Sequence, residues 1–196
     1  MKKYNRKNGM SLIEIMFTIT IGFLILLVIN DFIAKGFKSI TISSEKEDAI
    51  EHARIALESM TKEIRGANSS EKGDYPINTI EEQNFIYYTD IDRDGQTEKV
   101  RYYLDKGDNK LKMVTYKPGD LNNYDTIGET SILAEYVNNN NERIFSYYNS
   151  SGNETDEINR IGLIKILLKI NITPNRLPDD YEIETDVQFR NLKDKT

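Results

Sequence analysis

The segment Asp90-Ile-Asp-Arg-Asp-Gly95 has residue types and a spacing that could bind a metal ion. Alternating carboxylates followed by a glycine match the opening of a calcium loop, D-x-D-x-D-G, because Ca²⁺ prefers hard oxygen ligands and glycine permits the sharp turn. The twelfth position of such a loop should be a bidentate glutamate, but here it is Arg101. Glu98, at the ninth position, could add one more carboxylate. The candidate calcium ligands are therefore Asp90, Asp92, Asp94 and Glu98.

The same segment also has the properties of a hairpin turn. It lies between residues 84–89 (NFIYYT) and 99–104 (KVRYYL), which are rich in aromatic and β-branched residues, and Asp-Gly is a common turn pair. We therefore expect a turn, no bound metal and no cofactor, with calcium as the alternative.

Glu14 is a second residue whose position suggests a specific role. It is the only charged residue between Met10 and Asn30, in a run of about twenty residues that is otherwise strongly apolar. Twenty helical residues rise about 30 Å, the thickness of the hydrocarbon core of a bilayer. A charge at the centre of such a span costs roughly 2.5–3.5 kcal/mol, so an acid retained there usually has a partner and a function.

The residues on either side of the apolar run predict its topology. Residues 1–9 (MKKYNRKNG) contain four basic and no acidic residues, which favours a cytoplasmic N-terminus and an extracytoplasmic remainder. A removable secretory signal would end in a small-residue cleavage motif, but the run continues into NDFIAKGFKS and exceeds the usual length of an h-region. We therefore expect a single-pass protein of the cell membrane that keeps its span.

Composition excludes several classes of function. The 196 residues include no cysteine and one histidine, which removes thiol catalysis, disulfide frameworks and His-rich metal sites. The net charge of −6 argues against nucleic-acid binding, which needs a basic surface. No nucleophile–base–acid set or phosphate-binding loop is present. We expect neither an enzyme nor a nucleic-acid partner.

Periodicity predicts an α+β fold. Apolar residues from Ile50 to Ile64 recur every three or four positions, which indicates an amphipathic helix that ends near Arg65. Short β-type runs bounded by turn residues follow, and they predict an antiparallel sheet packed on the helix. The expected strands are 84–89, 99–104, 110–116, 131–137, 143–148, 161–171 and 182–190. The expected regions are a leader at 1–9, a helix at 10–66 with a membrane span at about 10–30, and a β-rich head at 67–196.

The N-terminal motif resembles the leader of type IV prepilins and type II secretion pseudopilins. Its elements are a short basic leader ending in Gly9, then Met10-Ser-Leu-Ile-Glu14 and the apolar helix. The resemblance implies that a prepilin peptidase cleaves between Gly9 and Met10 and that the amine of Met10 is methylated. It also implies that Glu14, the fifth mature residue, is needed for assembly.

The head is similar to the larger minor pilins of the W/J type, in residues 53–65, in the 85–104 hairpin and in the TDVQFRN ending. This likeness implies a pilin-like head and a minor subunit of the tip or priming complex of a pilus or secretion pseudopilus. The implied partners are other pilin or pseudopilin subunits, the prepilin peptidase, the inner-membrane assembly platform and, before assembly, membrane lipids. Two alternatives are a pilin-anchored interaction module for adhesion, DNA uptake or secreted-protein recruitment, and a membrane-anchored extracellular enzyme.

Overall fold

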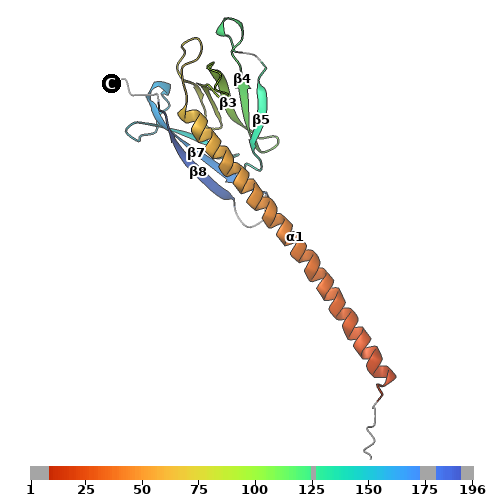
Figure 1. Ribbon diagram of the computed structural model, residues 1–196. Helices are drawn as coiled ribbons and strands as arrows, with labels where there is room; N and C mark the ends of the chain where they lie inside the picture. The colour runs from red at the N-terminus through yellow and green to blue at the C-terminus, as the bar shows by residue number, and fades with distance from the viewer. Residues whose placement is uncertain (1–8, 125–126, 173–179, 191–196) are drawn as a thin grey trace, which may run out of the picture. The chain divides into compact units, whose positions relative to one another are not determined.

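The structure, a computed structural model, describes residues 9–124, 127–172 and 180–190. One long helix, α1 (Leu12–Arg65), contains both the apolar run and the amphipathic stripe, and its end at Arg65 confirms the prediction. The chain divides into two compact units, Met1–Glu45 and Lys46–Thr196, which are described separately. In the second unit, the last five turns of α1 pack on β-strands, which confirms the expected α+β, pilin-like arrangement (Figure 1).

Two antiparallel sheets form the β-structure of the second unit, where the sequence predicted a single sheet. The larger sheet contains β1 (Ile77–Ile80), β2 (Asn84–Thr89), β3 (Glu98–Asp105), β4 (Lys110–Tyr116) and β5 (Glu129–Ala134), in that order. The smaller sheet contains β6 (Phe145–Asn149), β7 (Ile161–Ile170) and β8 (Tyr181–Gln188). Two short 3₁₀ turns lie at Asp120–Asn122 and Ile158–Arg160.

The segment between β5 and β6 connects the two sheets. Its residue Asn139 is fully buried and bonds to the backbone of β7. The Asn139 amide donates to the carbonyl of Leu167 (3.0 Å) and accepts from the Lys169 N–H (2.8 Å). The chain therefore leaves β5 at Ala134 and continues along the second sheet. From sequence, the asparagine run 138–141 resembles a loop tip, and nothing in it indicates burial.

The core lies between the stripe of α1 and the inner faces of both sheets. Ala53, Met60 and Ile64 on the helix are fully buried, as their three- and four-residue spacing predicts. Phe85 of β2 joins the two sheets. Its ring stacks on that of Tyr87, with 5.1 Å between the ring centroids, and packs against the ring of Phe145 of β6, with 5.7 Å between the centroids.

A series of side-chain hydrogen bonds connects the helix to the larger sheet. The Tyr102 hydroxyl donates a short hydrogen bond to the Glu63 carboxylate and lies 2.9 Å from the Tyr87 hydroxyl. Burial raises the pKa of both tyrosines, so they stay neutral, and one of them can donate to a carboxylate. In the sequence, Glu63 looks like one more charged residue on the polar side of an amphipathic helix, and no local pattern marks it as a partner of Tyr102.

Candidate functional site

The residues expected to be processed lie immediately before α1. Gly9 and Met10 are both exposed and precede the first helical residue, Leu12, by only a few positions. Residues 1–8, which form the rest of the expected leader, lie outside the described part of the chain. The bond between these two residues is therefore accessible from solvent.

Glu14 lies in the first turn of α1, where its backbone N–H donates to the Ser11 carbonyl at 3.0 Å. The helix macrodipole favours a negative charge at this end. Its side chain is exposed and forms no ion pair with any residue that the structure describes. A partner for this carboxylate would therefore have to come from the undescribed N-terminal residues or from another molecule.

The helix that follows is strongly apolar up to Asn30, and none of the residues in this part is buried within its own unit. An eighteen-residue window has a mean hydropathy of 2.7 and is 0% buried, so the helix is long and apolar enough to span a membrane. Its polar side chains bond to the helix's own backbone. Thr18, Thr20 and Asn30 each donate to a carbonyl three or four residues earlier, at 2.8 Å. Polar groups satisfied in this way can enter a hydrocarbon environment at low cost.

The candidate calcium ligands are positioned by the β2–β3 hairpin. Thr89 pairs with Glu98 in the strand register, which closes a loop over residues 90–97. The sequence therefore predicted the two strands correctly, but the connection is longer than a two-residue turn. Arg93 (φ 62°) and Gly95 (φ 91°) adopt left-handed backbone conformations, which fold the loop back on itself.

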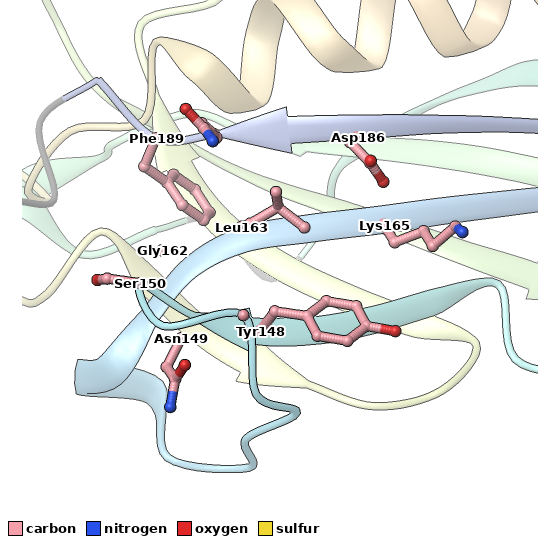
Figure 2. Close-up of a pocket in the computed structure, with 10 residues that line it drawn as sticks. Tyr148, Asn149, Ser150, Gly162, Leu163, Lys165, Asp186 and Phe189 are labelled. Carbon is pink, nitrogen blue, oxygen red and sulfur yellow. The ribbon is translucent and has the colours of Figure 1, made fainter.

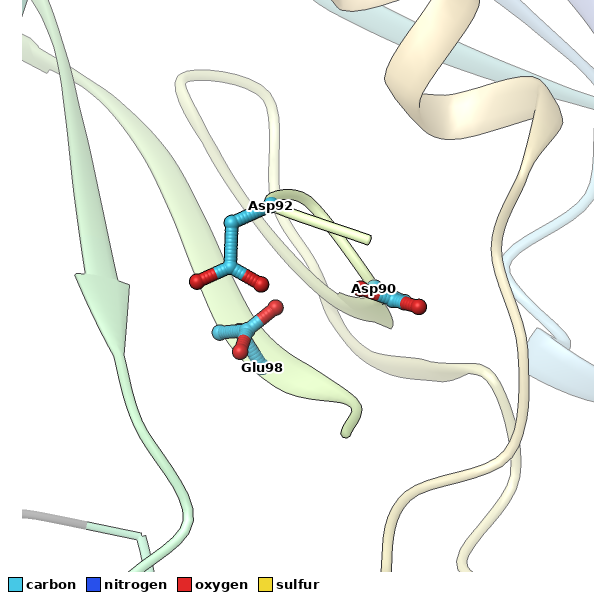
Figure 3. Close-up of side chains that lie close together, drawn as sticks. All are labelled: Asp90, Asp92 and Glu98. Atoms are coloured by element: carbon cyan, nitrogen blue, oxygen red, sulfur yellow. The ribbon is translucent and has the colours of Figure 1, made fainter. Parts of the chain in front are cut away.

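Three of the four predicted ligands come together in this loop. Asp90, Asp92 and Glu98 each offer a carboxylate oxygen, and these three oxygens lie within 4.8 Å of one another. In Figure 3 the carboxylates of Asp92 and Glu98 face each other, with that of Asp90 to one side. Asp94 is not part of this cluster. One of its carboxylate oxygens accepts from the Gln96 N–H at 2.8 Å and supports the turn.

The environment of Glu98 is unusual for a carboxylate. The residue is only 1% exposed, and its Oε2 accepts from the Ile91 N–H at 2.9 Å. Its Oε1 and the Oδ1 of Asp90 are buried and have no hydrogen-bond partner among the residues that the structure describes. Burial raises the pKa of Glu98, and repulsion from the Asp92 carboxylate adds to this effect. One cation contacts the cluster in the described chain: Lys117 Nζ lies 3.0 Å from Asp92 Oδ2.

Arg101, which stands where a calcium loop has its twelfth ligand, takes no part in this site. It lies inside β3, where its Nε donates to the Asn84 side chain at 2.7 Å and its guanidinium lies over the Tyr103 ring. The structure therefore agrees with the sequence that a complete twelve-residue calcium loop is absent here.

A pocket of about 580 Å³ lies at one end of the smaller sheet (Figure 2). It is lined by residues of β6, β7 and β8 and the β6–β7 turn, including Tyr148, Ser150, Lys165, Asp186 and Phe189. Lys165 is paired with Glu184 at 2.9 Å. Among the described residues that line the pocket, Ser150 is the only serine or threonine, and there is no histidine that could activate its hydroxyl.

Comparison with known proteins identified no relative: no family model, no curated protein and no solved structure matches the chain.

Proposed function

We propose that this chain is a minor type IV pilin or pseudopilin, processed by a prepilin peptidase, N-methylated at Met10 and assembled into the tip or priming complex of a filament. The observation that carries the proposal is the organisation of residues 9–30. An exposed Gly9–Met10 bond is followed by a helix whose only charge up to Asn30 is Glu14. An apolar helix exposed all round needs either lipid or other helices to cover it. A subunit that moves from a membrane into a filament uses both.

The proposed topology places residues 1–9 in the cytoplasm and the head outside, in accordance with the basic leader. The first charges after the span support a boundary near residue 31. Asp31 and Lys35 pair at 2.7 Å on successive turns of the exposed helix, where a membrane interface would solvate them. The partners in this proposal are other pilin or pseudopilin subunits, the peptidase, the assembly platform and lipids.

The surface charge of the head bears on the alternative of a DNA-uptake module. The segment 106–117 of the head contains four lysines. Three of them are neutralised by carboxylates: Lys110 by Glu135, Lys112 by Asp105 and Asp108, and Lys117 by Asp92. Lysines paired in this way offer little attraction to a phosphate backbone. The structural-subunit proposal is therefore favoured over DNA binding.

Processing can be tested at Gly9. We expect Gly9→Ala to abolish cleavage, so that mass spectrometry of the purified protein finds the intact leader, whereas the normal protein begins at a methylated Met10. A Cβ added at Gly9 has no heavy atom within 4 Å, so the change should not disturb the fold. The expected loss therefore reports recognition by the peptidase.

Gly22→Ala is the matched control, because its added Cβ also meets nothing within 4 Å and it lies inside α1, away from the proposed cleavage site. This variant should be cleaved and methylated normally. Recovery of the normal protein with residues 1–9 still attached, in cells that contain an active prepilin peptidase, would contradict the proposed function.

A further inference from the structure

From the geometry of the β2–β3 loop we infer that Asp90, Asp92 and Glu98 form a binding site for a hard divalent cation, with Ca²⁺ the preferred ion. The three carboxylates offer oxygens within 4.8 Å of one another, and Glu98 is 99% buried with Oε1 unpartnered. This inference concerns the head and does not depend on the proposed filament function.

The cluster lacks the positive charge that three neighbouring carboxylates need. A buried carboxylate oxygen without a hydrogen bond or a counter-charge is costly, and like charges at this separation repel strongly away from bulk water. Lys117 compensates only part of this charge. It contacts Asp92 Oδ2, and its side chain is 60% exposed. Within residues 9–124, 127–172 and 180–190, the Oδ1 of Asp90 and the Oε1 of Glu98 have no hydrogen-bond partner. A divalent ion among the three carboxylates would supply the missing positive charge.

The ligand chemistry favours calcium. All three side chains provide oxygen, and no histidine belongs to the cluster, so the site suits a hard cation better than zinc or copper. Calcium accepts irregular coordination by carboxylates, loop carbonyls and water, whereas Mg²⁺ demands near-octahedral geometry. The site differs from a helix–loop–helix calcium site, because its last acidic ligand is the first residue of a β-strand, Glu98.

The base of the loop is already anchored to the rest of the head. The Thr97 N–H donates to the Glu71 carboxylate at 2.7 Å, and the Tyr124 hydroxyl donates to the Thr97 carbonyl at 3.0 Å. Glu98 is therefore held in place, while Asp92 lies on the exposed part of the loop. A bound cation would tie this exposed part to the anchored base and stiffen the hairpin.

The test is calorimetric titration of CaCl₂ into the metal-free full-length protein in a non-ionic detergent, together with its melting temperature. We expect saturable heat for one ion per chain and a higher melting temperature with calcium. Asp92→Asn and Glu98→Gln should each weaken binding by about tenfold or more, since ligand charge sets calcium affinity. Tyrosine circular dichroism in the near ultraviolet should show that both variants remain folded. If Glu98→Gln does not fold, the affinity of Asp92→Asn for calcium alone tests the inference, because Asp92 is exposed and its replacement should not disturb the fold.

Asp94→Asn is the matched control within the same loop. The asparagine retains the oxygen that accepts from Gln96, and we expect its affinity to stay within about threefold of the normal protein, since Asp94 is outside the cluster. Lys117→Gln should bind calcium more tightly, because it removes a competing cation. Absence of saturable heat in the normal protein, with an unchanged melting temperature, would overturn the inference. An equal loss of binding in Asp94→Asn and Asp92→Asn would overturn this set of ligands.

Discussion

Glu14→Val is expected to remain in the membrane but to disappear from sheared filaments. Cleavage after Gly9 would liberate the Met10 amine, and methylation keeps that amine basic. A neighbouring subunit's amine could then pair with the Glu14 carboxylate, which has no ion pair within the described chain. Two unit charges 4 Å apart attract by about 4 kcal/mol at an effective dielectric constant of 20. This attraction is comparable to the roughly 2.5–3.5 kcal/mol that an acid costs at the centre of a membrane span.

The pair would therefore favour the assembled state over separate subunits in the lipid. Valine removes both the attraction and the cost, so insertion should be unaffected or improved while assembly fails. The measurement is immunoblotting of the sheared filament fraction and of the membrane fraction from the same cells. Glu14→Gln, which retains the shape and loses the charge, should behave like valine.

Thr18→Val is the control one turn further along the helix. Its hydroxyl donates only to the Ile15 carbonyl of its own helix, so assembly should not need it. Normal amounts of the Glu14→Val protein in filaments would refute the proposed role of the charge. Equal loss of the Thr18→Val protein would show that any change in this helix disturbs assembly.

Phe85→Ala is expected to produce a large loss of stability in the head. The Phe85 side chain is 0% exposed and lies between the two sheets, in contact with the rings of Tyr87, Phe145 and Tyr147. Truncation of a buried phenylalanine costs about 3–5 kcal/mol, because the lost contacts leave a cavity that rigid neighbours cannot fill. For a chain of this length the melting temperature should fall by roughly 6–20 °C.

The measurement is thermal unfolding of the full-length protein in detergent, followed by the near-ultraviolet circular dichroism of its tyrosines, since the chain contains no tryptophan. Ile132→Ala on β5 is the control: this residue is 52% exposed, and its truncation should change the unfolding free energy by about 0.5 kcal/mol or less. A loss from Phe85→Ala no larger than that of the control would show that the two sheets are not joined through this ring.

Local sequence patterns determined most of the secondary structure. The end of α1 at Arg65 and the bounds of β2 and β4 were predicted correctly, because helical and strand periodicity act over a few residues. Strand β1 was missed because its four residues, INTI, are too few to establish an alternation. The predicted strand 131–137 occupies Glu129–Ala134 instead, because the residues after Ala134 pair with the second sheet.

For the candidate sites, the sequence alone identified the Gly9–Met10 bond, the isolated charge of Glu14 and the acidic loop, because each lies within one short segment of the sequence. Tertiary structure decided which carboxylates meet. The strand register brings Glu98 close to Asp90 and Asp92, and Glu98 is buried there. Asp94 is nearer to these two residues in the sequence, but its carboxylate accepts a hydrogen bond from the Gln96 N–H instead. Burial, and with it the uncompensated charge that points to a cation, depends on β2, β3 and residues far along the chain. That property is three-dimensional, and no spacing of acidic residues in the sequence could have revealed it.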